Sequence, residues 1–407
     1  MFEPNRTAAL SRLKGFLPQA GRDYASKRNF DLPGEGHPHV SSLSPYIRHR
    51  LITEEEVLGA VLARHSPQAA EKFIAEVCWR TYWKGWLELR SSIWGDYVAG
   101  RDRARQDYAG DKALARAEDG RSGVEALDAW TAELLETGYL HNHARMWYAS
   151  IWIFTLGLPW QLGADLFLRN LIDGDPASNT LGWRWVAGLH TRGKHYLARP
   201  DNIAKYTSGR FRPKDLNTKA GPLKGADLPK PGSPPRQDYI DPSLPTAFLL
   251  TEEDLSPGYL LAQFAGDSLG HAALLADDAR SDAEVAGHVT TFTEGAIADA
   301  SARWADKLGP AGPVSRDPVA LARWAEASGA SQIVAPYTPT GPAKTRLKTL
   351  RKLLPEKDIQ LIIPIRDWDR IGYPRATHGF FRFKDVIPDL LDLTRPDGTG
   401  DLFARAS

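Results

Sequence analysis

The spacing of apolar residues changes part-way along the chain. Up to about residue 212, apolar side chains recur at intervals of three and four positions, which places them on one face of an α-helix. β-Branched alternation is scarce, so this part is predicted to be all helical. The segments with the clearest helical pattern are 6–20, 53–65, 67–90, 123–140 and 142–158.

A different pattern follows residue 245. Short apolar runs alternate there with helical stretches such as 317–329 and 343–354. This alternation is typical of a parallel α/β sheet in which each run forms a strand. The expected strands are 246–250, 272–276, 331–337 and 359–365.

Between the two patterns, residues 212–245 contain eight prolines interspersed with Gly and Lys. Such a segment continues neither a helix nor a central strand, so it is predicted to be an extended linker. The sequence therefore predicts a multidomain protein of classes α and α/β. Its expected units are a helical domain at 1–212, a Pro-rich linker at 213–245 and an α/β domain at 246–407.

Composition narrows the class of protein. The net charge is +1, so any contact with nucleic acid has to come from a local basic patch. The single cysteine, Cys78, excludes a disulfide framework and Cys-ligated metal clusters, and it favours a cytoplasmic protein. No apolar run has membrane-spanning length. There are 13 Trp and 13 Tyr, and this high proportion of Trp suggests aromatics used for stacking or redox chemistry as well as packing.

Three short segments contain residue types that carry chemistry. In 170–185, two aspartates lie two positions apart and two tryptophans flank Arg184, a pattern that a surface turn and core packing also explain. In 41–50, Ser44 is placed to cap a helix with Pro45 at its first position, which suits either a phosphate site or an ordinary helix start. In 73–83, one helical face mixes acid, guanidinium and indole, and a surface ion pair would explain only the charges.

A metal site is not expected from the sequence. His141 and His143 are two positions apart, so on a helix their side chains point in different directions. The Asp-Gly-Asp run offers no further carboxylate at the spacing of a calcium loop.

Taken together, five motifs resemble the flavin-binding domain of the photolyase and cryptochrome family, in the family's order and over about residues 10–212. The motifs are "GRDYASKRNF", "SSLSPYI", "EVCWRTYW", "GYLHNHARM" and "LIDGDPASNTLGWRW". The resemblance implies an all-helical FAD-binding domain in which the acid pair faces the flavin and a tryptophan feeds it electrons. The FAD-binding positions it implies are Tyr24, Ser41, Ser42, Leu43, Ser44, Arg80, Asn142, Arg145, Asp173, Gly174, Asp175 and Asn179.

The resemblance also implies catalytic and DNA-binding positions. Trp183 and Trp160 match the first two electron-relay tryptophans, whereas Asp107 stands at the third, so either Tyr108 or Trp147 ends the relay or photoreduction is impaired. The catalytic set is completed by Glu76 and Asn179. The pocket for a cyclobutane pyrimidine dimer is matched by Arg28, Glu76, Trp79, Asn142, Met146 and Trp185. Two positions depart from the family: Val40 replaces a threonine and His143 replaces an arginine.

The α/β region resembles, more weakly, the α/β domain that family members normally carry ahead of the flavin domain. The resemblance implies the usual two domains in reversed order, with a Rossmann-like parallel sheet; an unrelated α/β module is the alternative. It assigns no antenna chromophore.

Three functions are open at this point. The first is light-dependent repair of DNA containing pyrimidine dimers, the second a cryptochrome-like photoreceptor without repair activity, and the third a flavoprotein with a structural or redox role. A stretch with seven Lys or Arg against one Asp, 191–214, is suited to contact DNA phosphates around a flipped-out lesion, although an ordinary solvated loop would look the same. The sequence names no protein partner.

Overall fold

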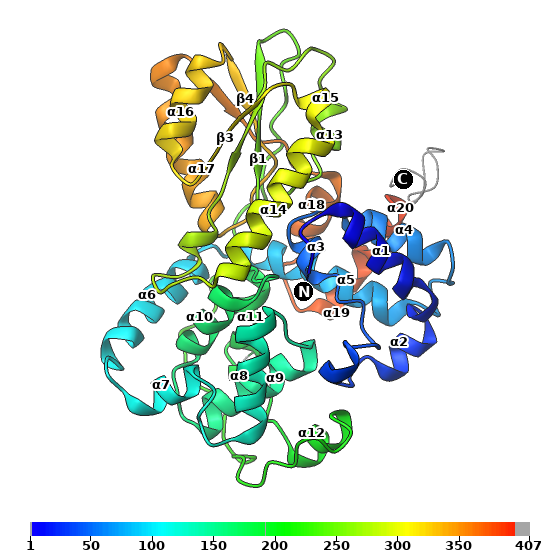
Figure 1. Cartoon of the computed structure of the whole chain (residues 1–407), viewed down its shortest axis with the longest axis vertical. Coiled ribbons are helices and arrows are strands. Elements are labelled where there is room, and N and C mark those ends of the chain that lie inside the picture. Colours follow the sequence, from blue (N-terminus) through cyan, green and yellow to red (C-terminus); the bar gives the residue numbers. More distant parts are fainter. Residues whose placement is uncertain (1, 192, 395–407) are drawn as a thin grey trace.

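A computed structural model describes residues 2–191 and 193–394, and in it a helical body carries an α/β unit at one end (Figure 1). The expected fold class, helical followed by parallel α/β, is confirmed. No described helix is long and apolar enough to cross a membrane.

Within the described residues, twelve α-helices precede the linker. Local signals set their ends: Thr53 and Glu56 form a capping box at the start of α4, and Gly188, at φ 82°, ends α11 in the left-handed region. The predicted helix over 142–158 is interrupted, because residues Ile151–Thr155 form a π-helical turn. The helices are α1 Arg6–Phe16, α2 Arg22–Lys27, α3 Ser44–Arg48, α4 Glu54–Leu62, α5 Glu71–Glu88, α6 Ser92–Asp107, α7 Lys112–Glu118, α8 Glu125–Thr137, α9 Asn142–Ser150, α10 Trp160–Asn170, α11 Pro176–Ala187 and α12 Pro200–Tyr206.

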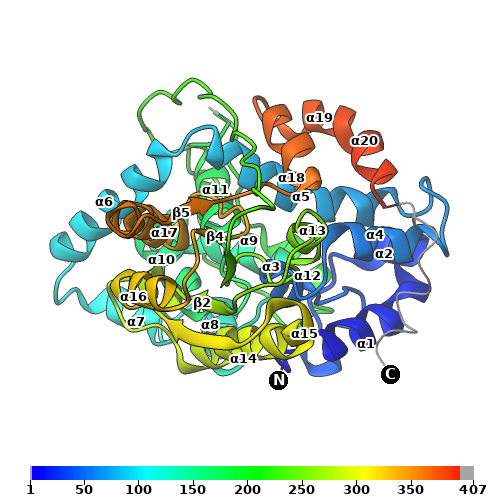
Figure 2. The same cartoon turned by 90° about the horizontal axis from the view of Figure 1, so that it is seen from above.

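The α/β unit is built on a five-stranded parallel sheet of order β3-β2-β1-β4-β5. Its strands are β1 Thr246–Thr251, β2 His271–Leu274, β3 Ala311–Ser315, β4 Gln332–Val334 and β5 Gln360–Ile362. Alternate residues of β1 point to opposite faces: Leu249 packs with α16 (Pro318–Ala327) and α17 (Pro342–Leu353), and Phe248 packs on the side of α14 (Gly287–Arg303). The view from above shows these helices around the sheet (Figure 2).

Strand β3 was not predicted. It is the edge strand next to β2, it reads Ala-Gly-Pro-Val-Ser, and its Val314 is 54% exposed. An exposed edge strand that contains Gly and Pro lacks the apolar run from which a strand is predicted.

The last described helices return to the helical body. They are α18 Asp367–Gly372, α19 Phe380–Phe383 and α20 Ile387–Asp392, and they lie beside α4 and α5 (Figure 1). Buried Trp368 donates its Nε1–H to Thr81 of α5 at 2.8 Å. Gly85 allows a close approach here, because a Cβ at this position would lie 2.7 Å from Tyr373 Cα. The predicted domain boundaries stay a prediction, since residues 367–392 pack against elements far upstream.

Buried ion pairs join the α/β unit to the helical body. Arg50 donates to Asp369 at 2.7 and 2.8 Å and lies 3.0 Å from Glu54 and 3.1 Å from Asp254, and none of these side chains is more than 4% exposed. Burial by itself would raise the pKa of Glu54, but Arg50 and Arg80 lower it to about 2. The stability that Glu54 contributes is therefore present above its ordinary pKa of 4.5 and is lost as the pH falls towards 2.

Asp369→Asn should lower the free energy of unfolding by about 3 kcal/mol, because a buried guanidinium loses one of its counter-charges. Urea unfolding followed by circular dichroism measures the change. The matched control is Asp367→Asn in the same helix, whose side chain is 65% exposed and which should change stability by less than about 0.5 kcal/mol. Equal stability of the two variants would show that the buried network contributes little.

Candidate functional site

The acidic loop between α10 and α11 is held by side chains from three other segments. Asp173 Oδ2 accepts from Ser44 Oγ at 2.5 Å and from Arg145 Nη2 at 2.8 Å, so the expected Arg145–Asp173 pair is present. Asp175 caps α11, because its Oδ1 accepts from the backbone N–H of Ser178 at 2.8 Å. The Asp-Gly-Asp run is thus an ordered loop, and its two carboxylates, Asp173 and Asp175, are both buried.

Three cations converge on Asp175. Its Oδ2 lies 2.7 Å from Lys84 Nζ, 3.8 Å from Arg80 and 3.9 Å from Arg48. Burial alone would raise the pKa of this carboxyl, but Lys84, Arg80 and Arg48 hold it well below its usual range. Asp175 is therefore ionised at neutral pH.

Lys84 also reaches into the α/β unit. Its Nζ donates to Glu253 Oε2 at 2.9 Å, and Glu253 receives a second donor from Arg48 at 2.7 Å. Against the effect of burial, Arg48 and Lys84 lower the pKa of Glu253 to about 2. Sequence analysis missed Lys84, although its place on α5 four residues after Arg80 was a signal that it shares that helical face.

One acceptor of this loop is unpaired, and a polar side chain of α11 lies next in the sequence. Asp173 Oδ1 is buried and has no hydrogen-bond partner within residues 2–191 and 193–394. Asn179 donates its Nδ2 to the carbonyl of Ala164 at 2.8 Å, which directs its oxygen elsewhere. A buried acceptor without a donor is costly, so these residues fit the polar N–H edge of a planar heterocycle such as a flavin.

Residues 41–44, which contain three serines, contact this loop, but Ser44 does not cap a helix as expected. Leu43, and not Ser44, is the N-cap residue of α3, and Ser44 uses its hydroxyl on Asp173. The prediction that Ser44 caps a helix is wrong, because its side chain finds an anionic acceptor across the site. Ser42 is buried in the left-handed region, at φ 48°, and Ser41 is half-buried beside it.

Glu76 and Arg80 are four positions apart on α5 but do not pair. Arg80 donates to Glu54 at 3.1 Å, and Glu76 lies 3.9 Å from Arg28. Although 39% of the Glu76 side chain is exposed, partial desolvation raises its pKa, and Arg28 opposes this shift. Tyr24 of α2, also expected at the site, is buried against Phe73 of α5.

The two pocket tryptophans each have an aromatic neighbour. Trp79 stacks on Phe380 of α19, with ring centroids 3.8 Å apart and planes 10° apart, and Trp185 stacks on Tyr196 at 5.9 Å. On α9, Asn142 is exposed and Met146 half-buried. One face of Trp79 is therefore occupied by a residue 301 positions later in the sequence.

The aromatic contacts of Trp160 continue through residues that the sequence did not indicate. Its ring lies 5.8 Å from Tyr97, which lies 5.3 Å from Trp94. Trp183 packs edge-on against Trp152 at 6.3 Å. Of the two predicted relay ends, Trp147 instead stacks on Trp130 at 5.6 Å, and Tyr108 is only partly buried at the edge of the same cluster. The i, i+3 spacing of Trp94 and Tyr97 on α6 was the available signal.

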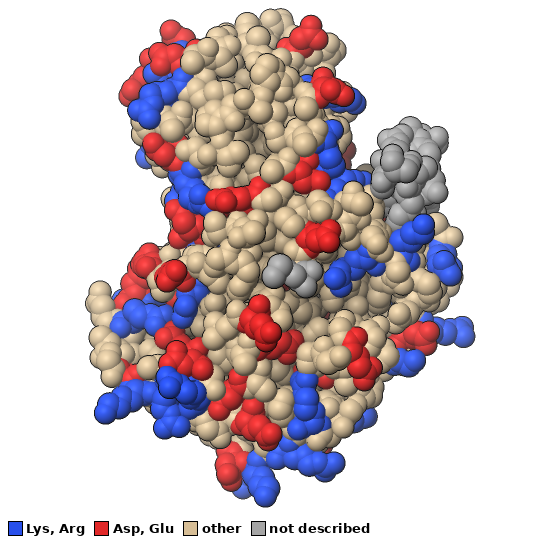
Figure 3. All heavy atoms as spheres, viewed as in Figure 1, with Lys and Arg blue, Asp and Glu red and all other residues tan. Residues whose placement is uncertain are grey.

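Acidic side chains neutralise part of the positive charge of the basic stretch 191–214. Arg210 pairs with Asp31 at 2.7 Å, and Arg199 pairs with Asp201. Arg192 lies outside the described residues. On the face seen in Figure 3, charges of both signs are interspersed.

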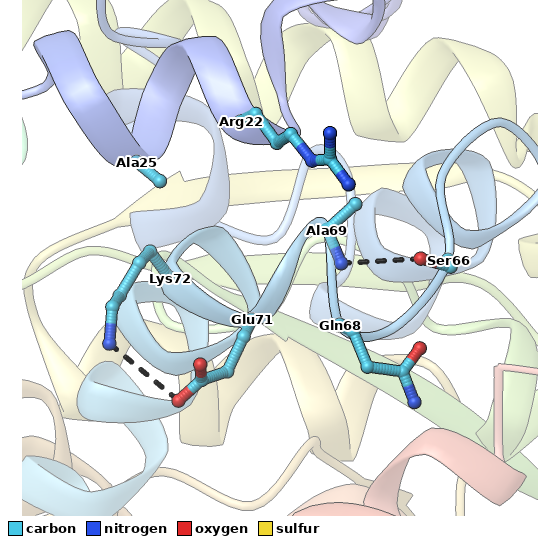
Figure 4. A pocket seen from close by; sticks show the side chains of 7 residues that line it. All are labelled: Arg22, Ala25, Ser66, Gln68, Ala69, Glu71 and Lys72. Atoms are coloured by element: carbon cyan, nitrogen blue, oxygen red, sulfur yellow. Dashed lines mark hydrogen bonds and ion pairs between the residues drawn. The ribbon is translucent and has the colours of Figure 1, made fainter.

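Two cavities lie away from the acidic loop. One of ≈ 240 Å³ lies between α2 and the start of α5, and Lys72 at its edge pairs with Glu71 (Figure 4). The other, of ≈ 380 Å³, lies between the linker and α17 and is lined by Glu88 and Lys344 among others. None of the predicted site residues lines either cavity.

Residues 73–209 match the family model for the FAD binding domain of DNA photolyase. A deoxyribodipyrimidine photo-lyase of Thermus thermophilus is 37% identical over 195 residues, which are 46% of this chain and 43% of that protein. The deoxyribodipyrimidine photo-lyase of Escherichia coli is 29% identical over 203 residues, which are 48% and 42% of the two chains. This chain thus spans less than half the length of these two relatives.

Two solved structures are similar over half of the chain. A bacterial class III photolyase from Agrobacterium tumefaciens is 27% identical with a TM-score of 0.44, covering 51% of this chain and 44% of that one. A cryptochrome from Synechocystis is 24% identical with a TM-score of 0.42, covering 50% and 43%. The matched segment contains α9, the acidic loop and α11, so this part of the chain is similar to the FAD binding domain of DNA photolyase.

Proposed function

We propose that this protein binds FAD and uses blue light to split cyclobutane pyrimidine dimers in DNA. The observation that carries the proposal is the acidic loop, in which Asp173 is fixed by Arg145 and Ser44 while its second oxygen stays buried and unpaired. The residues that would hold FAD are Tyr24, Ser41, Ser42, Leu43, Ser44, Arg80, Asn142, Arg145, Asp173, Gly174, Asp175 and Asn179. The relatives named deoxyribodipyrimidine photo-lyase support this substrate.

The bound flavin supplies light-driven electron transfer, and the chain's own residues bind and orient the flavin and the damaged DNA. Asp173 and Asn179 would offer acceptors to N–H groups of the flavin, and the ionised Asp175, paired with Lys84, would contribute a fixed negative charge to the site. Glu76 has a raised pKa, so it holds a proton to higher pH than an ordinary carboxyl and can donate it to the edge of a damaged base. Trp79 and Trp185 offer faces on which bases stack.

A second function, a photoreceptor without repair, is favoured by one contact. Phe380 covers a face of Trp79 at 3.8 Å, where a damaged base would otherwise stack. His143 in place of a cationic arginine also weakens the grip on phosphates, because burial lowers the pKa of His143 to about 4 and leaves it neutral. In this role the protein would bind FAD without discriminating damaged from intact DNA.

Phe380→Ala separates the two functions. If the protein repairs DNA, removing this ring should strengthen binding to dimer-containing oligonucleotides by about 5- to 150-fold, the equivalent of one base stack of 1–3 kcal/mol. Fluorescence anisotropy measures affinity, and loss of the dimer under blue light measures repair by the reduced protein. Phe381→Ala, which removes the adjacent side chain that is 87% exposed, is the control. Equal affinity of wild type and both variants for damaged and intact DNA, without repair, would favour the photoreceptor.

Trp183→Phe tests the electron relay. Photoreduction of oxidised flavin should slow sharply, since phenylalanine is much harder to oxidise than tryptophan, while repair by chemically reduced protein should be nearly intact. Transient absorption follows the flavin. Tyr97→Phe should also slow photoreduction if Tyr97 carries electrons onward from Trp160, and unchanged rates in both variants would rule out this route.

Lys84→Met should weaken FAD binding and lower stability. It leaves Asp175 and Glu253 with Arg48 as the only cation that contacts both among the described residues, so the pKa of both should rise and the stability present at neutral pH should fall by about 3 kcal/mol. Flavin content after gel filtration and thermal unfolding measure the effects. The control is Lys72→Met on the same helix, an exposed lysine. Glu253→Gln in the Lys84→Met background should restore part of the stability; no restoration would show that the pair does not act through charge.

A further inference from the structure

A second cluster of metal-ligating side chains lies outside the acidic loop. It contains Asp31 and His37 from the segment between α2 and α3, and Glu133 from α8. One potential ligand atom of each residue lies within 4.8 Å of those of the other two. Asp31 is fully buried, His37 is 8% exposed, and the Glu133 side chain is 13% exposed.

Two buried polar atoms of this cluster face each other without partners. Asp31 Oδ2 is used by Trp130 Nε1 at 2.9 Å and by Arg210 at 2.7 Å, whereas Asp31 Oδ1 has no hydrogen-bond partner among the described residues. His37 Nδ1 is equally buried and unpartnered, and it lies 3.7 Å from that oxygen. The distance is too long for a hydrogen bond. It is close to the roughly 3.4 Å that separates two ligands of one tetrahedral Zn²⁺ ion bound at about 2.0–2.1 Å.

Glu133 completes the arrangement. Its Oε1 lies 3.0 Å from His37 Nε2, on the other side of the ring. A carboxylate in this position either becomes a ligand by moving towards the ion or fixes the ring orientation of a ligating histidine, as carboxylates around zinc sites do. Asp31 and Glu133 bring two carboxylates to the cluster, and Arg210 pairs with Asp31.

We propose that Asp31 and His37 bind a Zn²⁺ ion, with Glu133 as a third ligand or as the acceptor that orients the His37 ring, and with water in the remaining coordination positions. Imidazole nitrogen together with carboxylate oxygen suits zinc, whereas Mg²⁺ prefers oxygen ligands alone and retains its waters. The ion would tie the segment between α2 and α3 to α8. This proposal does not depend on FAD binding or on DNA repair.

The expected consequence of this site is local. The tied segment runs directly into Ser41 and Ser42, and His37 packs against Tyr139 with ring centroids 5.4 Å apart. Removing the ion should therefore loosen residues 31–42 before it affects the rest of the helical body.

The test uses the full chain, treated with a chelator and dialysed. Titration with Zn²⁺ in a calorimeter should show one site per chain and a rise in melting temperature, and Mg²⁺ should produce neither. Asp31→Asn and His37→Gln should abolish stoichiometric binding, and Glu133→Gln should weaken it by about 10- to 100-fold. Glu136→Gln, an exposed acid one turn away on α8, should bind as the wild type does.

Two results would overturn the proposal. The first is that the folded wild-type protein binds no Zn²⁺ and that NMR spectra at pH 8 show His37 protonated on both ring nitrogens. The ring would then bridge the carboxylates of Asp31 and Glu133 without an ion. The other is binding that survives in both Asp31→Asn and His37→Gln. If His37→Gln fails to fold, the comparison of Asp31→Asn with Glu136→Gln still decides.

Discussion

The structure depends on burying three consecutive carboxylates, Glu252, Glu253 and Asp254, in the junction between its two parts. Such charges leave water only if cations meet them, and Arg48, Arg50 and Lys84 of the helical body do so. Because a loop at the end of a parallel strand supplies the acids, the sheet is positioned by ion pairs as well as by apolar contact. Removing either side of the junction would leave uncompensated charge on the other.

This junction also reaches the acidic loop. Lys84 and Arg48 each contact both Glu253 and Asp175, so a residue after β1 and a residue at the start of α11 share these two cations. The charge state of the loop is thereby linked to the docking of the α/β unit. In this chain the α/β unit follows the helical region in sequence, yet its first strand ends against the same loop.

Local signals made part of this architecture predictable. The helical and α/β regions follow from apolar spacing, and the Arg145–Asp173 pair joins two recognisable motifs only 28 positions apart. The rest depends on contacts that no local pattern encodes. Phe380 reaches Trp79 from a helix of four residues, and the His37–Glu133 contact joins a loop to a helix 96 positions later. The histidines considered for metal binding, His141 and His143, are two positions apart in the sequence, whereas the cluster of Asp31, His37 and Glu133 is assembled only by the fold.

The return of α18 to α20 onto α4 and α5 has a consequence for biosynthesis. Residues 1–212 contain the flavin-binding motifs, but the helical body lacks Trp368 against Thr81 and Tyr373 against Gly85 until residues about 300 positions later have left the ribosome. The apolar surface of α4 and α5 therefore stays uncovered while the linker and the sheet are synthesised. Completion of the helical body therefore has to follow synthesis of residues 367–392, and chaperones can bind the uncovered apolar surface during that interval.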